Sequence, residues 1–163
     1  MLLGASPDAG RDVAIGAQAP PGVAAFGWPL DQHQVVRRFD PPPERWLPGH
    51  RGVDLAGSPS AVVHAAGTGT VVFAGQVAGR GVISVVHPGG LRTTYEPVIP
   101  SVAVGETVVP GSDLGRLTPG HPGCPAAACL HWGLRRGALY LDPLALLGLG
   151  RVRLLPLTTG PPS

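Results

Sequence analysis

The chain has 163 residues, which is enough for one domain with a single buried core. All twelve basic residues are arginine, so the composition excludes functions that need a lysine amine, such as lipoyl or biotin carriage, Schiff-base chemistry and a phosphate-binding P-loop. The net charge is only +2 and no basic run is longer than two residues, so a nucleic-acid partner is not expected.

Residues 1–25 are small, polar and proline-rich, and we interpret them as a leader or flexible linker. The segment FGWPL begins at Phe26 and opens a domain that is expected over residues 26–148, with residues 149–163 as a tail. The N-terminal stretch lacks a charged n-region and a full apolar core, so no intact signal peptide is expected there. No run approaches about 18 apolar residues, so no transmembrane helix is expected.

The domain consists of short apolar segments separated by glycine, a pattern typical of β-strands joined by turns. A short strand is expected at VVRRF (residues 35–39), and the prolines in DPPPERWLPG exclude a helix or central strand over residues 40–49. Further strands are predicted at GVDLAG, AVVHAAG, GTVVFAGQV, GVISVVHPGG, LRTTYEPV, ETVV, DLGRL and CLHWGLRR.

Two features refine this prediction. Residues 69–98 are expected to form three antiparallel strands, with AGRG and PGG as turns. Helix is expected only over residues 141–150, as one or two turns with Asp142 as N-cap and Pro143 at the first position. We therefore predict an all-β fold, a compact antiparallel sheet or sandwich with Gly/Pro-rich loops and little helix.

The segment HRGVD places His50 and Asp54, two residue types that ligate zinc, four positions apart. In an extended strand these residues would lie about 13 Å apart, too far to share an ion. Gly52 lies between them and accepts the backbone angles of a tight bend, which would bring them together. The alternative is a surface histidine next to an aspartate that caps a turn.

The segment CLHWGLR supplies a third candidate ligand. On a strand, Cys129 and His131 point to one face, and Leu130 and Trp132 point to the other. A catalytic zinc site needs three protein ligands and a fourth position for water, and His131 would complete such a set. The alternative is a histidine packed in the core next to Trp132.

These segments resemble the lysostaphin/LytM-type zinc endopeptidases, which cut peptide cross-links of bacterial peptidoglycan. That family carries H-x-x-x-D, a later H-x-H on a strand and, between them, a histidine in a Y-x-H-like segment. HRGVD matches the first signature, and ALYLDP and VHAAGTGTVVFAG are also similar, so the resemblance extends from Trp28 to Leu147. It implies a LytM-type antiparallel β core, a groove over zinc, and His50, Asp54 and His131 as the zinc ligands.

The departures from the family pattern concern its two catalytic histidines. Cys129 stands at the first histidine of H-x-H, and Pro97 stands at the histidine of the Y-x-H-like segment. Loss of a general base typically costs about 10²–10⁴-fold in rate, so weak or altered hydrolysis is expected. Glu96, as a carboxylate base, and His121, from the loop PGHPGCP, are the candidate substitutes. Their alternatives are an exposed glutamate and an unconstrained loop histidine.

Cys124 and Cys129 are the two cysteines of the chain, and PAAA separates them. In the exported setting that the resemblance implies, a disulfide between them is the preferred interpretation. One alternative is Cys129 as a thiolate ligand that closes a His/Asp/Cys/His zinc site, and another is a nucleophilic thiol, for which no base is placed. A disulfide would remove Cys129 from ligation and rigidify the loop before His131.

The remaining polar residues give weaker indications. His33, His64 and His87 show no partner pattern and are expected at the surface or in turns. Arg135 and Arg136 follow the third ligand and could meet substrate carboxylates, with a solvated strand end as the alternative.

Two functions are compatible with this pattern. The first is a cell-wall-associated zinc metallopeptidase that acts weakly or in altered form on the stem or cross-bridge peptides of peptidoglycan. The alternative is a non-catalytic module on the same fold that binds peptidoglycan or regulates another wall hydrolase. The first implies zinc as the cofactor, and the second holds either zinc or no metal. Both imply an extracellular or cell-wall location on a bacterial envelope, and neither nucleic acid nor a membrane span.

Overall fold

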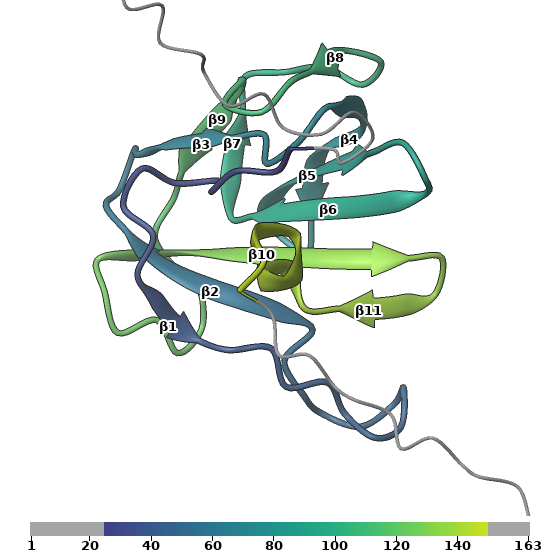
Figure 1. Ribbon diagram of the computed structural model, residues 1–163. Coiled ribbons are helices and arrows are strands. Elements are labelled where there is room, and N and C mark those ends of the chain that lie inside the picture. The colour runs from purple at the N-terminus through teal and green to yellow at the C-terminus, as the bar shows by residue number, and fades with distance from the viewer. Residues whose placement is uncertain (1–24, 150–163) are drawn as a thin grey trace, which may run out of the picture.

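The computed structural model describes residues 25–149, which form a β-rich body (Figure 1). The leader and tail expected at the two ends therefore lie outside the described residues, except for their boundary positions. Within the described part the chain is almost entirely strand and loop, as predicted, and its one helix is the short 3-10 segment η1 (Pro143–Leu147). No helix in residues 25–149 has the length and apolar character needed to cross a membrane.

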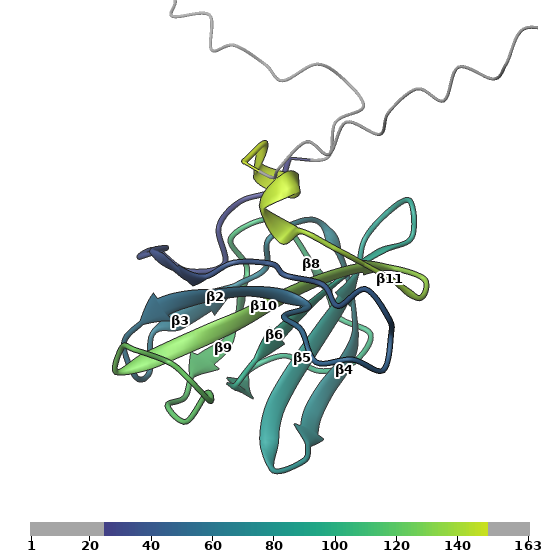
Figure 2. The same cartoon turned by 90° about the horizontal axis from the view of Figure 1, so that it is seen from below.

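The strands form two antiparallel sheets, which confirms the predicted fold class (Figures 1 and 2). The larger sheet runs in the order β1 (Val35–Arg37), β2 (Gly52–Gly57), β10 (Ala128–Arg136), β6 (Leu91–Glu96), β5 (Arg80–Val86), β4 (Gly69–Val77) and β8 (Thr107–Val108), and β11 (Leu139–Leu141) pairs with β10. The smaller sheet runs β3 (Val62–His64), β9 (Asp113–Leu117) and β7 (Val98–Pro100). Strands β4, β5 and β6 are the three antiparallel strands predicted over residues 69–98.

The side chains of the central strands alternate between two faces, and this alternation separates the core from the polar face. On β10, Leu130 and Trp132 are fully buried in the core. On the adjacent strand β2, Val53 lies directly opposite Trp132 and is also fully buried. Asp54 and His131 occupy the alternate positions, so both point to the other face of the sheet.

The proline-rich segment before β2 is a loop whose ends are tied together. Residues 41–49 contain no strand or helix, as the prolines predict. The Asp40 amide donates to the His50 carbonyl at 2.9 Å, and the His50 amide donates to the Asp40 carbonyl at 2.7 Å. This bridge fixes the backbone of His50 two residues before β2 begins. At the other end of the domain, Asp142 caps η1 by accepting from the Leu144 amide at 3.0 Å, also as predicted.

Candidate metal centre

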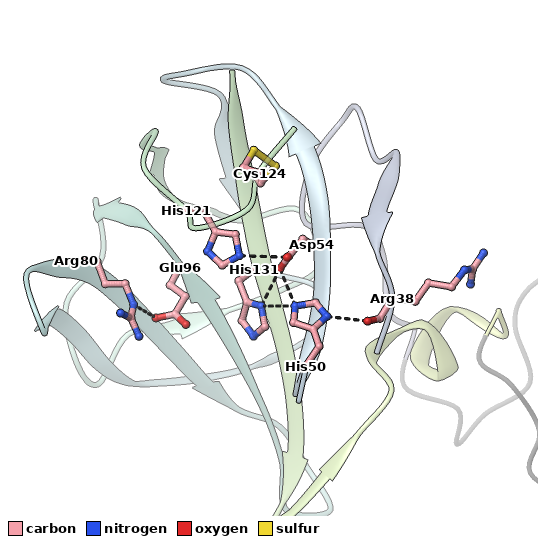
Figure 3. Close-up of polar contacts among 9 residues, drawn as sticks. Arg38, His50, Asp54, Arg80, Glu96, His121, Cys124 and His131 are labelled. Carbon is pink, nitrogen blue, oxygen red and sulfur yellow. Dashed lines mark hydrogen bonds and ion pairs between the residues drawn. A yellow bond between two sulfur atoms is a disulfide. The ribbon is translucent and has the colours of Figure 1, made fainter. Parts of the chain in front are cut away.

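The three candidate ligands converge on the polar face of strands β2 and β10 (Figure 3). The strand register places His131 directly opposite Asp54. His131 Nδ1 lies 2.8 Å from Asp54 Oδ1, and His50 Nε2 lies 3.0 Å from the same oxygen. The two histidine nitrogens are 3.1 Å apart. The structure therefore brings together all three residues that the sequence identified as candidate ligands.

The proton of His50 is placed by a backbone carbonyl. Its Nδ1 lies 2.7 Å from the Arg38 carbonyl oxygen, which can only accept a hydrogen bond, so Nδ1 carries the proton. In the neutral ring, Nε2 then presents a lone pair to Asp54 Oδ1. A backbone carbonyl on the far nitrogen is the usual support of a metal-ligating histidine.

The spacing of these atoms fits a metal ion. The triangle of two nitrogens and one oxygen has sides of 2.8, 3.0 and 3.1 Å. Tetrahedral zinc with bonds of about 2.0–2.1 Å separates its ligand atoms by about 3.3 Å, so the triangle is close to one face of a zinc tetrahedron. Converging lone pairs repel one another unless a cation lies between them. Donor types and spacing thus both suit zinc.

Gly52 is needed at this site for a reason other than the one predicted. It does not have a positive φ, and the bend in the chain lies at Arg51, just before β2 begins. A Cβ at this position would lie 2.5 Å from the Trp132 carbonyl oxygen and 2.7 Å from His131 Nε2. The missing side chain therefore lets β2 pass close to β10 while the His131 imidazole keeps its place over Asp54.

Asp54 stays ionised at the centre of the cluster. Burial raises the pKa of its carboxyl group, but the imidazoles of His121, His131 and His50 around it lower that pKa by more. The net effect holds the pKa of Asp54 well below its ordinary value, so the site presents a carboxylate at neutral pH.

His121 is the fourth polar side chain at the cluster. It comes from the loop between β9 and β10, and its Nε2 lies 3.1 Å from Asp54 Oδ2, the oxygen that faces away from His50 and His131. Its ring stacks near His131, with centroids 5.7 Å apart, and its side chain is only 13% exposed. Nε2 is buried without a well-formed hydrogen bond. The loop histidine is thus held against the ligands.

Cys124 and Cys129 form the expected disulfide, and no free cysteine occurs in the described residues. The bond joins the loop that carries His121 to the start of β10 (Figure 3). Cys129 is therefore neither a thiolate ligand nor a free nucleophile. Within the disulfide, the sulfur of Cys129 cannot act as a proton acceptor.

Glu96 is the last residue of β6, next to His131, and Pro97 follows it. Glu96 lies directly opposite His131 across the β6–β10 pair. Arg80 Nε donates to Glu96 Oε2 at 2.8 Å, and the glutamate side chain is mostly buried, so it is neither exposed nor free. Pro97 is buried and offers no group for proton transfer. The structure thus places Glu96 close to the site but ties its carboxylate to an arginine.

A groove of about 580 Å³ lies over the cluster, and its walls are basic. His50, His121 and His131 line it together with a single acidic side chain, Glu96. Five arginines complete the walls: Arg37, Arg51, Arg80, Arg92 and Arg135. Sequence reasoning considered only Arg135 among these, because strand register decides which of the others face the same groove.

The remaining histidines lie away from the groove. His33 is exposed and stacks on Trp28, with ring centroids 4.3 Å apart. His64 lies 3.2 Å from an Asp31 carboxylate oxygen. His87 follows β5 at a turn, but the expectation of a surface position is wrong for it, because it is only 2% exposed and hydrogen-bonds to the Thr68 carbonyl and the Thr93 hydroxyl, both at 2.8 Å.

Several solved structures share this fold at low sequence identity. Lysostaphin in solution superposes with a TM-score of 0.62 at 24% identity, over 87% of this chain and 62% of its own. A SpoIIQ–SpoIIIAH pore-forming complex gives 0.66 at 22% identity, over 76% of this chain and 91% of the matched one. A zinc-containing peptidase from Vibrio cholerae gives 0.56 at 24% identity, over 68% and 36%.

Two further comparisons concern the sequence itself. An uncharacterized protein of Mycobacterium tuberculosis is 52% identical over 163 residues, which covers 97% of this chain and 61% of that protein. The chain therefore spans about three fifths of the length of this relative. Residues 48–143, which include all three candidate ligands and Cys129, match peptidase family M23. The match covers more than half of the sequence, and the chain belongs to peptidase family M23.

Proposed function

We propose that this chain is a zinc-binding M23 domain that acts on the stem or cross-bridge peptides of peptidoglycan, on the extracellular or cell-wall side of a bacterial envelope. The observation that carries the proposal is the triangle of His50 Nε2, Asp54 Oδ1 and His131 Nδ1, whose sides are within a few tenths of an ångström of zinc-ligand spacing. The resemblance to lysostaphin-type endopeptidases supports peptidoglycan peptides as the target.

Each residue at such a centre has a distinct role. When bound, zinc lowers the pKa of a bound water and polarises a peptide carbonyl. His50 and His131 contribute neutral nitrogens and Asp54 contributes the negative charge, while the Arg38 carbonyl keeps the His50 proton on Nδ1. His121 covers the second oxygen of Asp54 and excludes water from that side.

Of the two candidate substitutes for the replaced histidines, His121 is the better placed. Its Nε2 lies 3.1 Å from Asp54 Oδ2 and its side chain lines the groove next to the ligands, so the imidazole can hold a proton close to a bound peptide. Glu96 also lines the groove, but its carboxylate already accepts a hydrogen bond from Arg80 Nε at 2.8 Å. We therefore infer that any hydrolysis proceeds slowly and relies on His121 rather than on Glu96.

A non-catalytic role on the same fold is the second candidate, and two observations favour it. Pro97 cannot transfer a proton, and Cys129 is bound in a disulfide. A domain with this site would bind wall peptides or regulate another wall hydrolase without cutting. The SpoIIQ–SpoIIIAH complex supports the idea that the fold also serves in protein assemblies.

Digestion of purified peptidoglycan separates the two roles. Natively purified protein is supplied with zinc and incubated with peptidoglycan, and the soluble fragments are identified by mass spectrometry. His50→Ala removes a ligand, and His33→Ala is a matched control, because His33 is an exposed histidine outside the groove. New peptide ends with wild type and His33→Ala, but not with His50→Ala, indicate a peptidase. Retained binding to the wall without fragments indicates the non-catalytic role.

A further inference from the structure

Two arginines face each other across the strands that form the floor of the groove. The β6–β10 register pairs His131 with Glu96, Gly133 with Thr94, and Arg135 with Arg92. These are alternate positions, so the five side chains of this set, Gly133 having none, point to the same face of the sheet. Both arginines line the groove that passes over the metal centre.

Neither arginine has an acidic partner in the described part of the chain. Arg80 is paired with Glu96, and Arg51 donates to the Arg45 and Leu47 carbonyls. The ion pairs found within residues 25–149 include neither Arg92 nor Arg135. The Nε of Arg92 is moreover buried without a hydrogen-bond partner.

This pairing is unfavourable in the free protein. Like charges directly opposite each other in an antiparallel pair destabilise the sheet. Partial burial, and then the positive charge of Arg135, lower the pKa of Arg92. The buried Nε of Arg92, a donor without a partner, adds a further cost. An anion bound between the two guanidinium groups would remove both costs.

We propose that Arg92 and Arg135 form a carboxylate-binding subsite of the groove, which takes an acidic group of a peptide bound over the metal centre. The inference rests on the proposed function only in taking a peptide as the occupant. Planar guanidinium groups match a carboxylate with two parallel hydrogen bonds each, which gives both affinity and orientation. The occupying group is either a free C-terminus or an acidic side chain, since both present the same carboxylate.

The floor between the two sites has room for a peptide. Gly133 and Thr94 are the small residues that separate the ligand His131 from the arginine pair. A Cβ at position 133 would meet nothing closer than 3.8 Å, so packing does not require glycine there. Arg135 lies four positions after His131 on β10, which is about 13 Å along the strand. Allowing for the reach of the arginine side chains, the carboxylate lies about two to four peptide residues from the metal centre.

Synthetic peptides test the subsite without requiring hydrolysis. Binding to the zinc-supplied protein is measured by isothermal titration for Ac-Ala-Ala-Ala-Ala-OH, for Ac-Ala-Glu-Ala-Ala-NH2 and for the neutral Ac-Ala-Ala-Ala-Ala-NH2. We expect at least one acidic peptide to bind about tenfold or more tightly than the neutral one, because hydrogen bonds between charged groups are the stronger class. The acidic peptide that binds identifies the source of the carboxylate.

Three charge-removing variants locate the effect. Arg92→Gln and Arg135→Gln should each abolish most of the preference for the acidic peptide over the neutral one. Arg116→Gln is the matched control, because it removes the same charge from an exposed residue on β9, outside the groove. Relief of the like-charge pair should also keep the melting temperature of Arg92→Gln at or above that of wild type, which shows that the variant is folded.

The outcomes separate this inference from the proposed function. Equal binding of acidic and neutral peptides, or an equal loss of preference in Arg116→Gln, would overturn the subsite. A phosphoserine peptide that binds tenfold more tightly than both carboxylate peptides would overturn the carboxylate assignment. The preference should survive in His50→Ala, because the arginines do not contact that ligand. A failure to digest peptidoglycan therefore does not affect this binding test. Equal binding of acidic and neutral peptides, in turn, does not affect the digestion test.

Discussion

Gly52→Ala tests whether close strand approach positions the metal centre. The added Cβ would lie 2.5 Å from the Trp132 carbonyl oxygen, a backbone atom that cannot move without displacing β10. It would also lie 2.7 Å from His131 Nε2, so the ring would have to turn away from Asp54. Overpacking of this kind typically costs about 1–3 kcal/mol of folding free energy. For a domain of this size, we expect the melting temperature to fall by roughly 4–12 °C.

The same substitution should weaken metal binding, because the strain can be relieved only by moving a ligand or the strand that carries it. Gly133→Ala is the matched control, since its Cβ has at least 3.8 Å of clearance on the same face of the sheet. Thermal unfolding followed by circular dichroism, with and without zinc, and competition with a zinc chelator measure both effects. Gly52→Ala with the stability and zinc affinity of Gly133→Ala would refute this reasoning.

Three further changes have defined expectations. His121→Ala should lower zinc affinity by about 10–100-fold, the usual effect of losing a group that supports a metal ligand, as measured by chelator competition. Cys124→Ser should lower the free energy of unfolding by about 2 kcal/mol, the loop-closure value for so short a loop, in urea titrations, and should also weaken zinc binding by freeing the His121 loop. Burial lowers the pKa of His87, so the unfolded chain binds a proton at this residue more readily than the folded chain does. The contribution of neutral, buried His87 to the stability of the fold is therefore present above about pH 6.5 and is lost as pH falls below it. Urea titrations of wild type and His87→Gln between pH 7 and pH 5 should therefore converge on the acidic side.

Each of these expectations has a contrary result. Unchanged zinc affinity in His121→Ala would make the histidine a packing residue only. Zinc affinity in Cys124→Ser equal to that of wild type would separate the disulfide from the metal centre. A stability difference between wild type and His87→Gln that is constant from pH 7 to pH 5 would mean that His87 does not titrate differently in the folded chain.

The strands and the ligands could be predicted because both are local patterns. Glycine-bounded apolar segments marked β2 and β10, and two-residue alternation placed His131 on the face opposite Trp132. The close approach at Gly52 could not be predicted, because it depends on which strand lies next to β2. Glycine was therefore expected to provide a bend, whereas the structure uses its missing side chain.

Features that depend on strand register or on the path of a loop could not be predicted from the sequence. His121 has a glycine and a proline on each side, so its position over Asp54 depends on the path of the β9–β10 loop, which the disulfide ties to β10. Arg135 shares the alternation of His131 and was a candidate, but its partner Arg92 follows only from the β6–β10 pairing. The Arg80–Glu96 ion pair likewise joins residues of different strands.

Zinc content tests the central claim most directly. Protein purified without chelators and then dialysed against buffered zinc is analysed by elemental mass spectrometry, with wild type, Asp54→Ala and His33→Ala measured side by side. We expect one zinc per chain in wild type and in His33→Ala, and a large loss in Asp54→Ala, because Asp54 Oδ1 contacts both histidine ligands. Equal zinc content in wild type and Asp54→Ala would contradict the metal centre built on His50, Asp54 and His131.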